Sequence, residues 1–336
     1  MAKGRSDRLR SIFNAAGKGL EIGPSHSPLM PKAAGFDVEI LDYLDAEGLR
    51  EKYARAGLDV SAVEEVDFIG DGRSMTEVIG ARNRYDWIVA SHVIEHVPDL
   101  VSFLADCEAL LKPGGSLVLA VPDKRCCFDI LRPISTVGQV LQAHVDGRKR
   151  PPPGIVFDDV AYARKRDGHI GWSLLDRGEL KEVRPAKDAW SMFEQARRSN
   201  AYIDMHCWVF VPSSFRLIVN ALATFGLIGM RELSFQVNDG EFFVALSTSA
   251  PLTELDVGAL TLAALAEERE ASILAGTEDL LKELESTRAE LSAALQRQAA
   301  EAQRVADITA STSWRVTAPL RAAKTLLART FSAPAT

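Results

Sequence analysis

The sequence predicts an α/β fold in which a mostly parallel, doubly wound sheet ends in an antiparallel hairpin. Between residues 19 and 121, short apolar runs typical of strands alternate with segments of helical periodicity. This alternation indicates βαβ units, whose strands run parallel and whose connections are right-handed. Farther along, Asp239-Gly240 separates two more strand-like runs, which is a strong signal for a hairpin.

The parallel part of the sheet accounts for residues up to 121. We expect its strands at 19–22, 36–42, 66–69, 85–91 and 116–121, with helices at 46–56 and 99–111. Asp99 is predicted to cap the second helix, because an aspartate side chain accepts hydrogen bonds from the first helical N–H groups. The helix is expected to end at Lys112-Pro113-Gly114-Gly115.

Residues 124–200 interrupt this regular order. They contain three consecutive prolines at 151–153, basic clusters at 148–150 and 164–166, and few periodic runs, so we expect an insertion over the sheet. Regularity returns at 202–210, where the alternation is that of a strand. A helix capped by Ser213 is predicted at 214–225, followed by the hairpin strands near 228–236 and 241–247.

The chain divides by composition into three parts. Residues 1–250 are predicted to form the α/β domain, 251–310 a helical extension, and 311–336 a basic amphipathic tail. A loose heptad in the extension predicts one long helix, and a coiled coil is an open alternative because the later positions are polar. The oligomeric state is therefore left open. The heptad positions are Leu280, Leu284, Thr287, Leu291, Ala294, Gln298, Glu301, Val305 and Ile308.

The composition argues against several classes of protein. A net charge of −7 disfavours a nucleic-acid binder, which normally has a basic balance. No apolar segment of the signal-peptide type follows residues 1–10, and the longest apolar run, 217–230, is too short to span a bilayer. The four cysteines form no CxxC pair. We therefore expect a cytoplasmic protein in a reducing environment.

Five short motifs follow one another along the predicted strands. They are Glu21-Ile22-Gly23, where the first strand runs into a glycine turn, Asp42 at the end of the second strand, Asp71-Gly72 after the third, the run from Tyr85 to His96, and the run from Leu111 to Ser116. In the order and spacing of these motifs, residues 18–125 resemble class I S-adenosylmethionine-dependent methyltransferases. The resemblance implies a Rossmann-like core and S-adenosyl-L-methionine as the cofactor.

The cofactor is expected at the carboxyl ends of the strands, where doubly wound sheets bind their ligands. Gly23 permits close approach of the backbone to the methionine portion, Asp42 is placed for the ribose hydroxyls, and Asp71 for the adenine amino group. A dehydrogenase is disfavoured, because the G-x-G-x-x-G loop that binds NAD is missing. The expected cofactor-binding residues are Glu21, Gly23, Pro24, Ser25, Asp42, Asp71, Gly72, Ser91, His92 and His96.

The segment His92-Val93-Ile94-Glu95-His96 matches the H-x-x-E-H pattern of inverzincin metallopeptidases. That zinc site needs both histidines on one helix, whereas here a strand is predicted to end at Ser91 and Pro98 follows closely. We therefore expect no metal ion. His92 and His96 are expected to line the cleft, and a purely structural histidine is the alternative.

A second group of polar residues lies at 202–210. If this segment is a strand, Tyr202, Asp204, His206, Trp208 and Phe210 share one face. Asp204 beside His206 is then a candidate pair of general base and orienting partner, and His92 is the other candidate base. The alternative is a hydrogen bond between Asp204 and His206 that only satisfies buried polar groups.

The segment from Ser313 to Arg321 resembles the end of methyltransferases and glycosyltransferases of bacterial surface-polysaccharide assembly. With the core motifs, this resemblance implies methylation of a sugar hydroxyl in a glycan or glycan precursor. A quinone- or lipid-type methyltransferase and a catalytically weak adaptor of a glycan-assembly complex are the alternatives.

The last 26 residues are expected to contact a partner. They carry four basic side chains and no acidic one, so a glycosyltransferase or the inner, anionic face of a membrane is the expected partner. The apolar anchors are Trp314, Val316, Leu320, Leu326 and Leu327.

Overall fold

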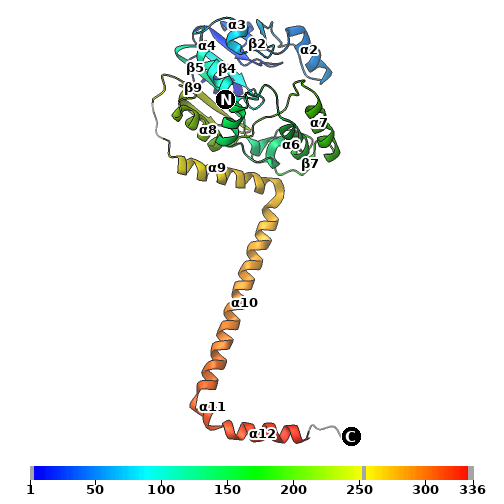
Figure 1. Cartoon of the computed structure of the whole chain (residues 1–336), viewed down its shortest axis with the longest axis vertical. Helices are drawn as coiled ribbons and strands as arrows, with labels where there is room; N and C mark the ends of the chain where they lie inside the picture. The colour runs from blue at the N-terminus through cyan, green and yellow to red at the C-terminus, as the bar shows by residue number, and fades with distance from the viewer. Residues whose placement is uncertain (1–3, 252–254, 332–336) are drawn as a thin grey trace. The chain divides into compact units, whose positions relative to one another are not determined.

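The computed structural model describes residues 4–251 and 255–331, without the side chains of 277–282 and 325–331. The chain forms two compact units, the first ending at Gly276 and the second beginning at Thr277 (Figure 1). The predicted boundary at residue 250 is wrong. Helix α9 (Val257–Ser272) belongs to the first unit, where Leu260, Ala264 and Ala271 are buried.

A seven-stranded sheet forms the centre of the first unit, in the order β3-β2-β1-β4-β5-β9-β8. The first five strands are parallel, and β9 is antiparallel to both β5 and β8, so the predicted fold class is confirmed. The strands are β1 (Gly19–Ile22), β2 (Val38–Asp42), β3 (Phe68–Ile69), β4 (Tyr85–Ser91), β5 (Leu111–Pro122), β8 (Arg231–Val237) and β9 (Glu241–Ser247).

Helices cover both faces of the sheet because alternate side chains of each strand point to opposite faces. Ile88 and Ala90 of β4 pack in a cluster with α4 and α8, whereas Trp87 and Val89 pack in a second cluster with Leu9. The helices around the sheet are α1 (Arg5–Arg10), η1 (Lys32–Ala34), α2 (Ala46–Arg55), α3 (Met75–Ile79), α4 (Leu100–Leu110) and α8 (Pro212–Thr224).

The two predicted helix caps have different outcomes. Asp99 caps α4 as expected, and its carboxylate accepts a hydrogen bond from the Ser102 N–H at 3.0 Å. Ser213 does not cap α8, because the helix begins at Pro212, two residues earlier than predicted, and proline suits the first helical position. Ser213 instead donates to Glu267 of α9, which ties this helix to the first unit.

The insertion is more regular than the sequence predicted. Its prolines begin helix α6 rather than a loop, since proline is accepted in the first helical turn. The insertion contains η2 (Lys124–Cys126), η3 (Phe128–Leu131), α5 (Val137–Val145), α6 (Pro153–Tyr162), the two-stranded sheet of β6 (Arg164–Arg166) and β7 (Leu180–Glu182), and α7 (Ala186–Arg198).

Residues 202–210 do not form the strand that their alternation suggested. The segment runs without ladder partners along the loop after β4, where the Cys207 and Trp208 N–H groups donate to the Glu95 carbonyl at 2.6 and 3.1 Å. His206 to Phe210 are all buried, so this part of the segment has no solvent-facing side. The alternation at 202–210 therefore does not mark a half-buried strand, since 206–210 are all buried whereas Tyr202 and Asp204 are exposed.

The second unit is helical. The predicted long helix is confirmed as α10 (Glu278–Ala310), which follows η4 (Ile273–Thr277) and precedes α11 (Thr312–Val316) and α12 (Ala318–Phe331). Its heptad side chains Leu284, Leu291, Val305 and Ile308 are exposed, and that of Leu280 lies outside the described residues. The side chains of the predicted tail anchors Leu326 and Leu327, in α12, also lie outside them. Among the helices that the structure describes, none has the length and apolar character needed to cross a bilayer.

Candidate functional site

The strand order reverses between β1 and β4, and this switch point is where a doubly wound sheet binds its ligand. Gly23 follows β1, Asp42 ends β2, and Ser91 ends β4 with His92 directly after it. The structure therefore brings together, at one end of the sheet, most of the residues predicted to bind a cofactor.

The loop after β1 has an unusual backbone. Gly23 has φ +62°, and a Cβ added there would lie 2.9 Å from the Val93 side chain. After Pro24, Ser25 has φ +59°, a conformation uncommon outside glycine, and its N–H donates to the Asp42 carboxylate at 3.3 Å. Such strained positions cluster at ligand sites, where the surrounding structure holds them in place. Asp42 is 3% exposed, and burial raises the pKa of its carboxyl group.

Glu21 lies behind this loop. Its two carboxylate oxygens accept hydrogen bonds from the Leu29 and Met30 N–H groups at 2.7 and 3.0 Å, and the side chain is 2% exposed. Burial raises the pKa of Glu21 to about 7, against the effect of both hydrogen bonds. The predicted direct contact with a cofactor does not fit this geometry, so we assign Glu21 to holding the chain that follows the loop.

Replacing Glu21 by glutamine will change how stability depends on pH. The pKa is higher in the folded chain, about 7, than its ordinary value of 4.5, so the stability linked to this group is present below pH 4.5 and lost as the pH rises through 7. Relative to Glu21→Gln, the parent should lose about 3 kcal/mol of unfolding free energy between pH 4 and pH 8. Denaturant titrations of both proteins across this range measure it, and a difference independent of pH would contradict it.

Asp71 and Gly72 follow the edge strand β3, on the far side of β2 from the switch point. The Asp71 carboxylate is exposed and pairs with Arg73 at 2.7 Å, and this hydrogen-bonded partner lowers the pKa of Asp71. Gly72 has φ +89° with open space around it. A contact of Asp71 with an adenine group stays a prediction.

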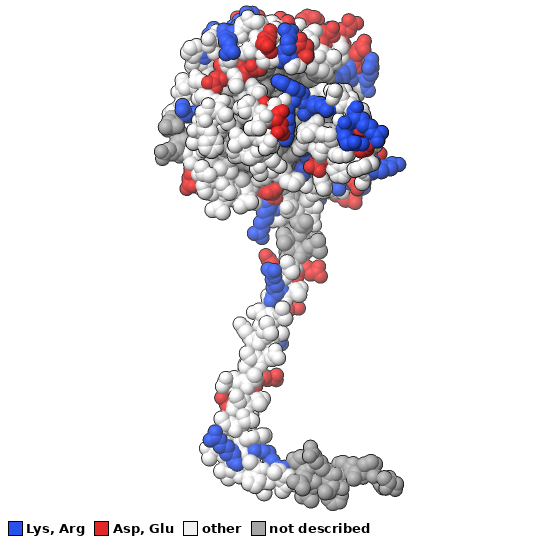
Figure 2. All heavy atoms as spheres, in the orientation of Figure 1, with Lys and Arg blue, Asp and Glu red and all other residues white. Residues whose placement is uncertain are grey.

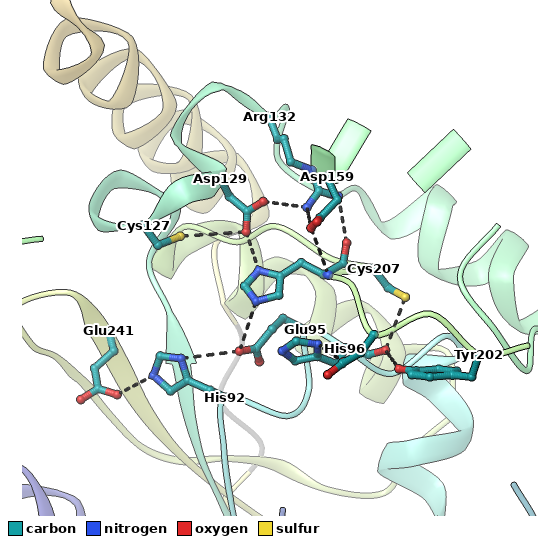
Figure 3. A network of polar contacts seen from close by, with 12 residues as sticks. His92, Glu95, His96, Cys127, Asp129, Arg132, Asp159, Tyr202, Cys207 and Glu241 are labelled. Atoms are coloured by element: carbon teal, nitrogen blue, oxygen red, sulfur yellow. Dashed lines mark hydrogen bonds and ion pairs between the residues drawn. The ribbon is translucent and has the colours of Figure 1, made fainter. Parts of the chain in front are cut away.

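A pocket of about 640 Å³ lies beside the switch point. It is bordered by the loop after β4, the start of the insertion, the segment 202–210 and the hairpin turn before β9. Figure 3 shows part of the polar network there, including His92, Glu95, His96 and Glu241. The charged and histidine side chains that line the pocket include Arg5, His92, Glu95, His96, Asp204, His206 and Glu241.

His92 is held at the mouth of this pocket. Its backbone has φ +53°, and its Nε2 lies 3.1 Å from a carboxylate oxygen of Glu241. Arg5 donates to both Glu241 oxygens at 2.7 Å and to the Ser91 hydroxyl at 2.7 Å. Although burial opposes it, hydrogen bonds from His92 and Arg5 lower the pKa of Glu241. No local pattern in the sequence marks Arg5 or Glu241, which are 236 residues apart.

The predicted pair of Asp204 and His206 does not form, which corrects the sequence analysis. His206 instead lies with Nδ1 2.5 Å from the Asp129 carboxylate, and Asp204 lies 2.8 Å from Nδ1 of His96. Burial favours neutral His206, but the charges of Asp129 and Glu95 outweigh it and raise the pKa of His206 to about 9. Asp129 is further held by Arg132 at 2.6 Å.

Glu95 sits between the histidines. Its side chain is fully buried, with one oxygen 3.6 Å from His92 Nδ1 and 4.0 Å from His206 Nε2 (Figure 3). Neither carboxylate oxygen has a hydrogen-bond partner among the described residues. A buried carboxylate is normally hydrogen-bonded or paired. Here His206 and His92 lie at ion-pair distance, and both Glu95 oxygens can still accept from or bind a further group. In the sequence, only the H-x-x-E-H pattern points to Glu95.

Residues 2–185, more than half of the chain, match the model of a protein family described as "Methyltransferase domain".

Among curated proteins, the chain is similar to ubiquinone biosynthesis O-methyltransferases. It is 50% identical over 46 residues to the protein of Rhodopseudomonas palustris strain TIE-1, covering 14% of this chain and 18% of the relative. It is 33% identical over 126 residues to the human mitochondrial protein, covering 31% of this chain and 33% of the relative. The chain thus spans well under two thirds of the length of these relatives.

Among solved structures, the chain is similar to S-adenosylmethionine-dependent methyltransferases. The Aquifex aeolicus protein is 12% identical with a TM-score of 0.37, over 72% of this chain and 88% of that chain. The Mesorhizobium loti protein is 13% identical with a TM-score of 0.38, over 72% of this chain and 98% of that chain.

Proposed function

Because the chain belongs to the methyltransferase domain family, we propose that it transfers the methyl group of S-adenosylmethionine to a hydroxyl group of a polar acceptor. The observation that carries the proposal is the position of the polar pocket, which adjoins the switch point of the sheet at Ser91 and His92. A cofactor at the switch point and an acceptor in the pocket are then neighbours.

The cofactor-binding part of the site is the strained loop after β1 with Asp42. At Gly23 the absence of a side chain leaves room for the methionine portion of the cofactor. Asp42 keeps a carboxylate at the end of β2, where it accepts from Ser25 and Tyr43 and has further lone pairs for ribose hydroxyls. S-adenosylmethionine has no phosphate, so the proline in this loop removes no donor that the ligand requires.

His92 is the proposed general base. Methyl transfer is an in-line displacement, so most of the catalysis is positioning, and a base takes the hydroxyl proton in the transition state. His92 faces the pocket, and Glu241 lies 3.1 Å from it, where its negative charge stabilises the imidazolium that forms. Arg5 acts as a positioning residue, because it holds Glu241.

A sugar hydroxyl is the proposed acceptor, in a glycan or glycan precursor. The pocket combines charged hydrogen-bonding groups with the aromatic side chains of Phe128 and Trp172, which suits a polar ring with several hydroxyls. The resemblance of residues 313–321 to proteins of surface-polysaccharide assembly supports the same class. Figure 2 shows both acidic and basic side chains on the visible face of the first unit. Because a nucleic-acid binder normally has a predominantly basic surface, this mixture argues against such a partner.

The second candidate acceptor is a phenolic quinone precursor. The observation that favours it is the local identity to ubiquinone biosynthesis O-methyltransferases. One experiment separates the two candidates. The protein is first titrated with S-adenosylmethionine and S-adenosylhomocysteine, and methyl transfer to sugar derivatives and to catechol-type phenols is then compared by mass spectrometry. Cofactor binding without transfer to any hydroxyl would contradict the proposal and favour a cofactor-binding adaptor.

The second unit is proposed to attach the protein to an anionic membrane surface. Trp314, Val316 and Leu320 are exposed on α11 and α12. The Arg321 guanidinium lies over the Trp314 ring, with its Cζ 3.6 Å from the ring centroid. A basic segment with an aromatic anchor suits that interface. Sedimentation with liposomes of anionic and of neutral lipid tests it. Binding of a glycosyltransferase, but of neither liposome, would refute the membrane proposal.

Ending the chain after Gly276 will leave cofactor affinity and melting temperature unchanged, because the described contacts of the site lie in the first unit. Ending it after Ala250 also removes α9 and will lower the unfolding free energy by on the order of 3 kcal/mol or more, through loss of the buried side chains of α9. Thermal melts and cofactor titrations of the two truncations measure this. Equal stability of the two would show that α9 is not part of the core.

A further inference from the structure

The buried group formed by Glu95, His96 and His206 has the composition of a metal site. We infer that these three side chains bind a divalent transition-metal ion, with zinc as the best match. One ligand atom from each residue lies within 4.8 Å of the other two. Ligands of one zinc ion lie roughly 3–4 Å apart, since each bond is about 2.0–2.2 Å long, so shifts on the order of 1 Å close the site.

Glu95 supplies the first independent observation. It is fully buried, it faces the pocket, and neither of its oxygens has a hydrogen-bond partner in the described part of the chain. A buried carboxylate is stable only when a cation or donors compensate its charge. The nearest nitrogens, at 3.6 and 4.0 Å, are beyond hydrogen-bonding distance. A metal ion between Glu95 and the imidazoles accounts for this arrangement.

The second observation is a carboxylate behind each histidine. Nδ1 of His206 lies 2.5 Å from Asp129, and Nδ1 of His96 lies 2.8 Å from Asp204. A histidine that binds a metal through one ring nitrogen usually donates its other N–H to a carboxylate, which fixes the tautomer and the ring orientation. For His206 this leaves Nε2, the nitrogen near Glu95, as the metal-binding atom. For His96 the Asp204 carboxylate lies at ion-pair distance from Nδ1 without the geometry of a hydrogen bond.

The ligand set differs from the H-x-x-E-H pattern that the sequence suggested. Nε2 of His92, the first histidine of the pattern, lies 3.1 Å from the Glu241 carboxylate. The third ligand comes instead from His206 in the segment 202–210. The absence of a zinc-binding helix therefore does not argue against a metal ion. Two imidazoles with one carboxylate are the ligands of several catalytic zinc sites, which keep a further position open.

The open side of this site faces the pocket, because all three ligand residues line it. A bound zinc ion would present a free coordination position to a hydroxyl oxygen of the acceptor and fix its orientation. This role rests on the proposed function, whereas binding of the ion does not. Imidazole ligands favour zinc and its first-row neighbours over magnesium, which prefers oxygen ligands.

The test is a calorimetric titration of untagged, full-length protein, stripped with a chelator, with zinc chloride alone. We expect one zinc ion per chain, and for cobalt(II) a visible absorption band of a low-coordinate ion. Glu95→Gln and His206→Gln should lower zinc affinity by more than about 100-fold. Asp204→Asn, at an exposed position that leaves the fold intact, should lower it by about 10–100-fold. Magnesium chloride should give no comparable binding.

His169→Gln is the control, because it replaces an exposed histidine of the insertion that does not line the pocket, and its zinc affinity should equal that of the parent. No zinc binding by the parent, or unchanged affinity in both Glu95→Gln and Asp204→Asn, would overturn the inference. Failure of the proposed function is measured separately. Zinc binding without methyl transfer to any hydroxyl contradicts the function alone, and methyl transfer by a protein that binds no metal contradicts the metal site alone.

Discussion

Replacing His92 by glutamine will lower the turnover number about 10²–10⁴-fold, the usual contribution of a general base. Glutamine keeps a polar side chain of similar length but does not take up a proton. Because the cofactor-binding loop and Asp42 are untouched, the affinity for S-adenosylmethionine should stay within about twofold. Steady-state rates at saturating cofactor, together with calorimetric titration of the cofactor, measure the two quantities.

His169→Gln is the control for this substitution, because His169 is an exposed histidine of the insertion. The turnover number of this variant should equal that of the parent. Glu241→Gln tests the positioning of His92, because it keeps the shape of the partner but removes its negative charge. It should reduce turnover less than His92→Gln does. Parent-like turnover of His92→Gln would show that another group accepts the proton.

Replacing Gly23 by valine will raise the dissociation constant for S-adenosylmethionine at least about tenfold. A β-branched residue at φ +62° is strained, and its Cβ would meet the Val93 side chain at 2.9 Å, so the loop must move at the place where the cofactor lies. The strain should also lower the unfolding free energy by about 1–3 kcal/mol. Calorimetry of cofactor binding and denaturant unfolding measure both effects.

Gly35→Val separates strain from the loss of a binding site. Gly35 also has positive φ, +88°, but an added Cβ meets nothing within 4 Å, and the residue lies at the end of η1, not in the loop after β1. This variant should lose stability and keep parent-like cofactor affinity. If Gly23→Val binds the cofactor as tightly as Gly35→Val does, the cofactor does not lie over the loop after β1.

The strand pattern of the first unit was predictable because each signal is local. Buried parallel strands such as Tyr85–Ser91 read as short apolar runs, and Asp-Gly marked the turn before β9. The same local rules gave wrong predictions for segments whose surroundings are contributed by distant parts of the chain. Residues 202–210 alternate like a strand but lack a ladder partner, and α9 was placed outside the domain because its contacts with α8 are not visible in composition.

The sequence alone determined the order of the βαβ units, the antiparallel hairpin and the motifs at the strand ends, since strand and turn preferences act over a few neighbouring residues. Only the tertiary structure decided which polar groups pair. Asp129 replaces Asp204 as the partner of His206, at a separation of 77 residues, and Arg5 reaches Glu241 across 236. Such pairs depend on how the insertion and the N-terminal helix fold over the strand ends. Their members are far apart in the sequence, so no local pattern predicts that they meet.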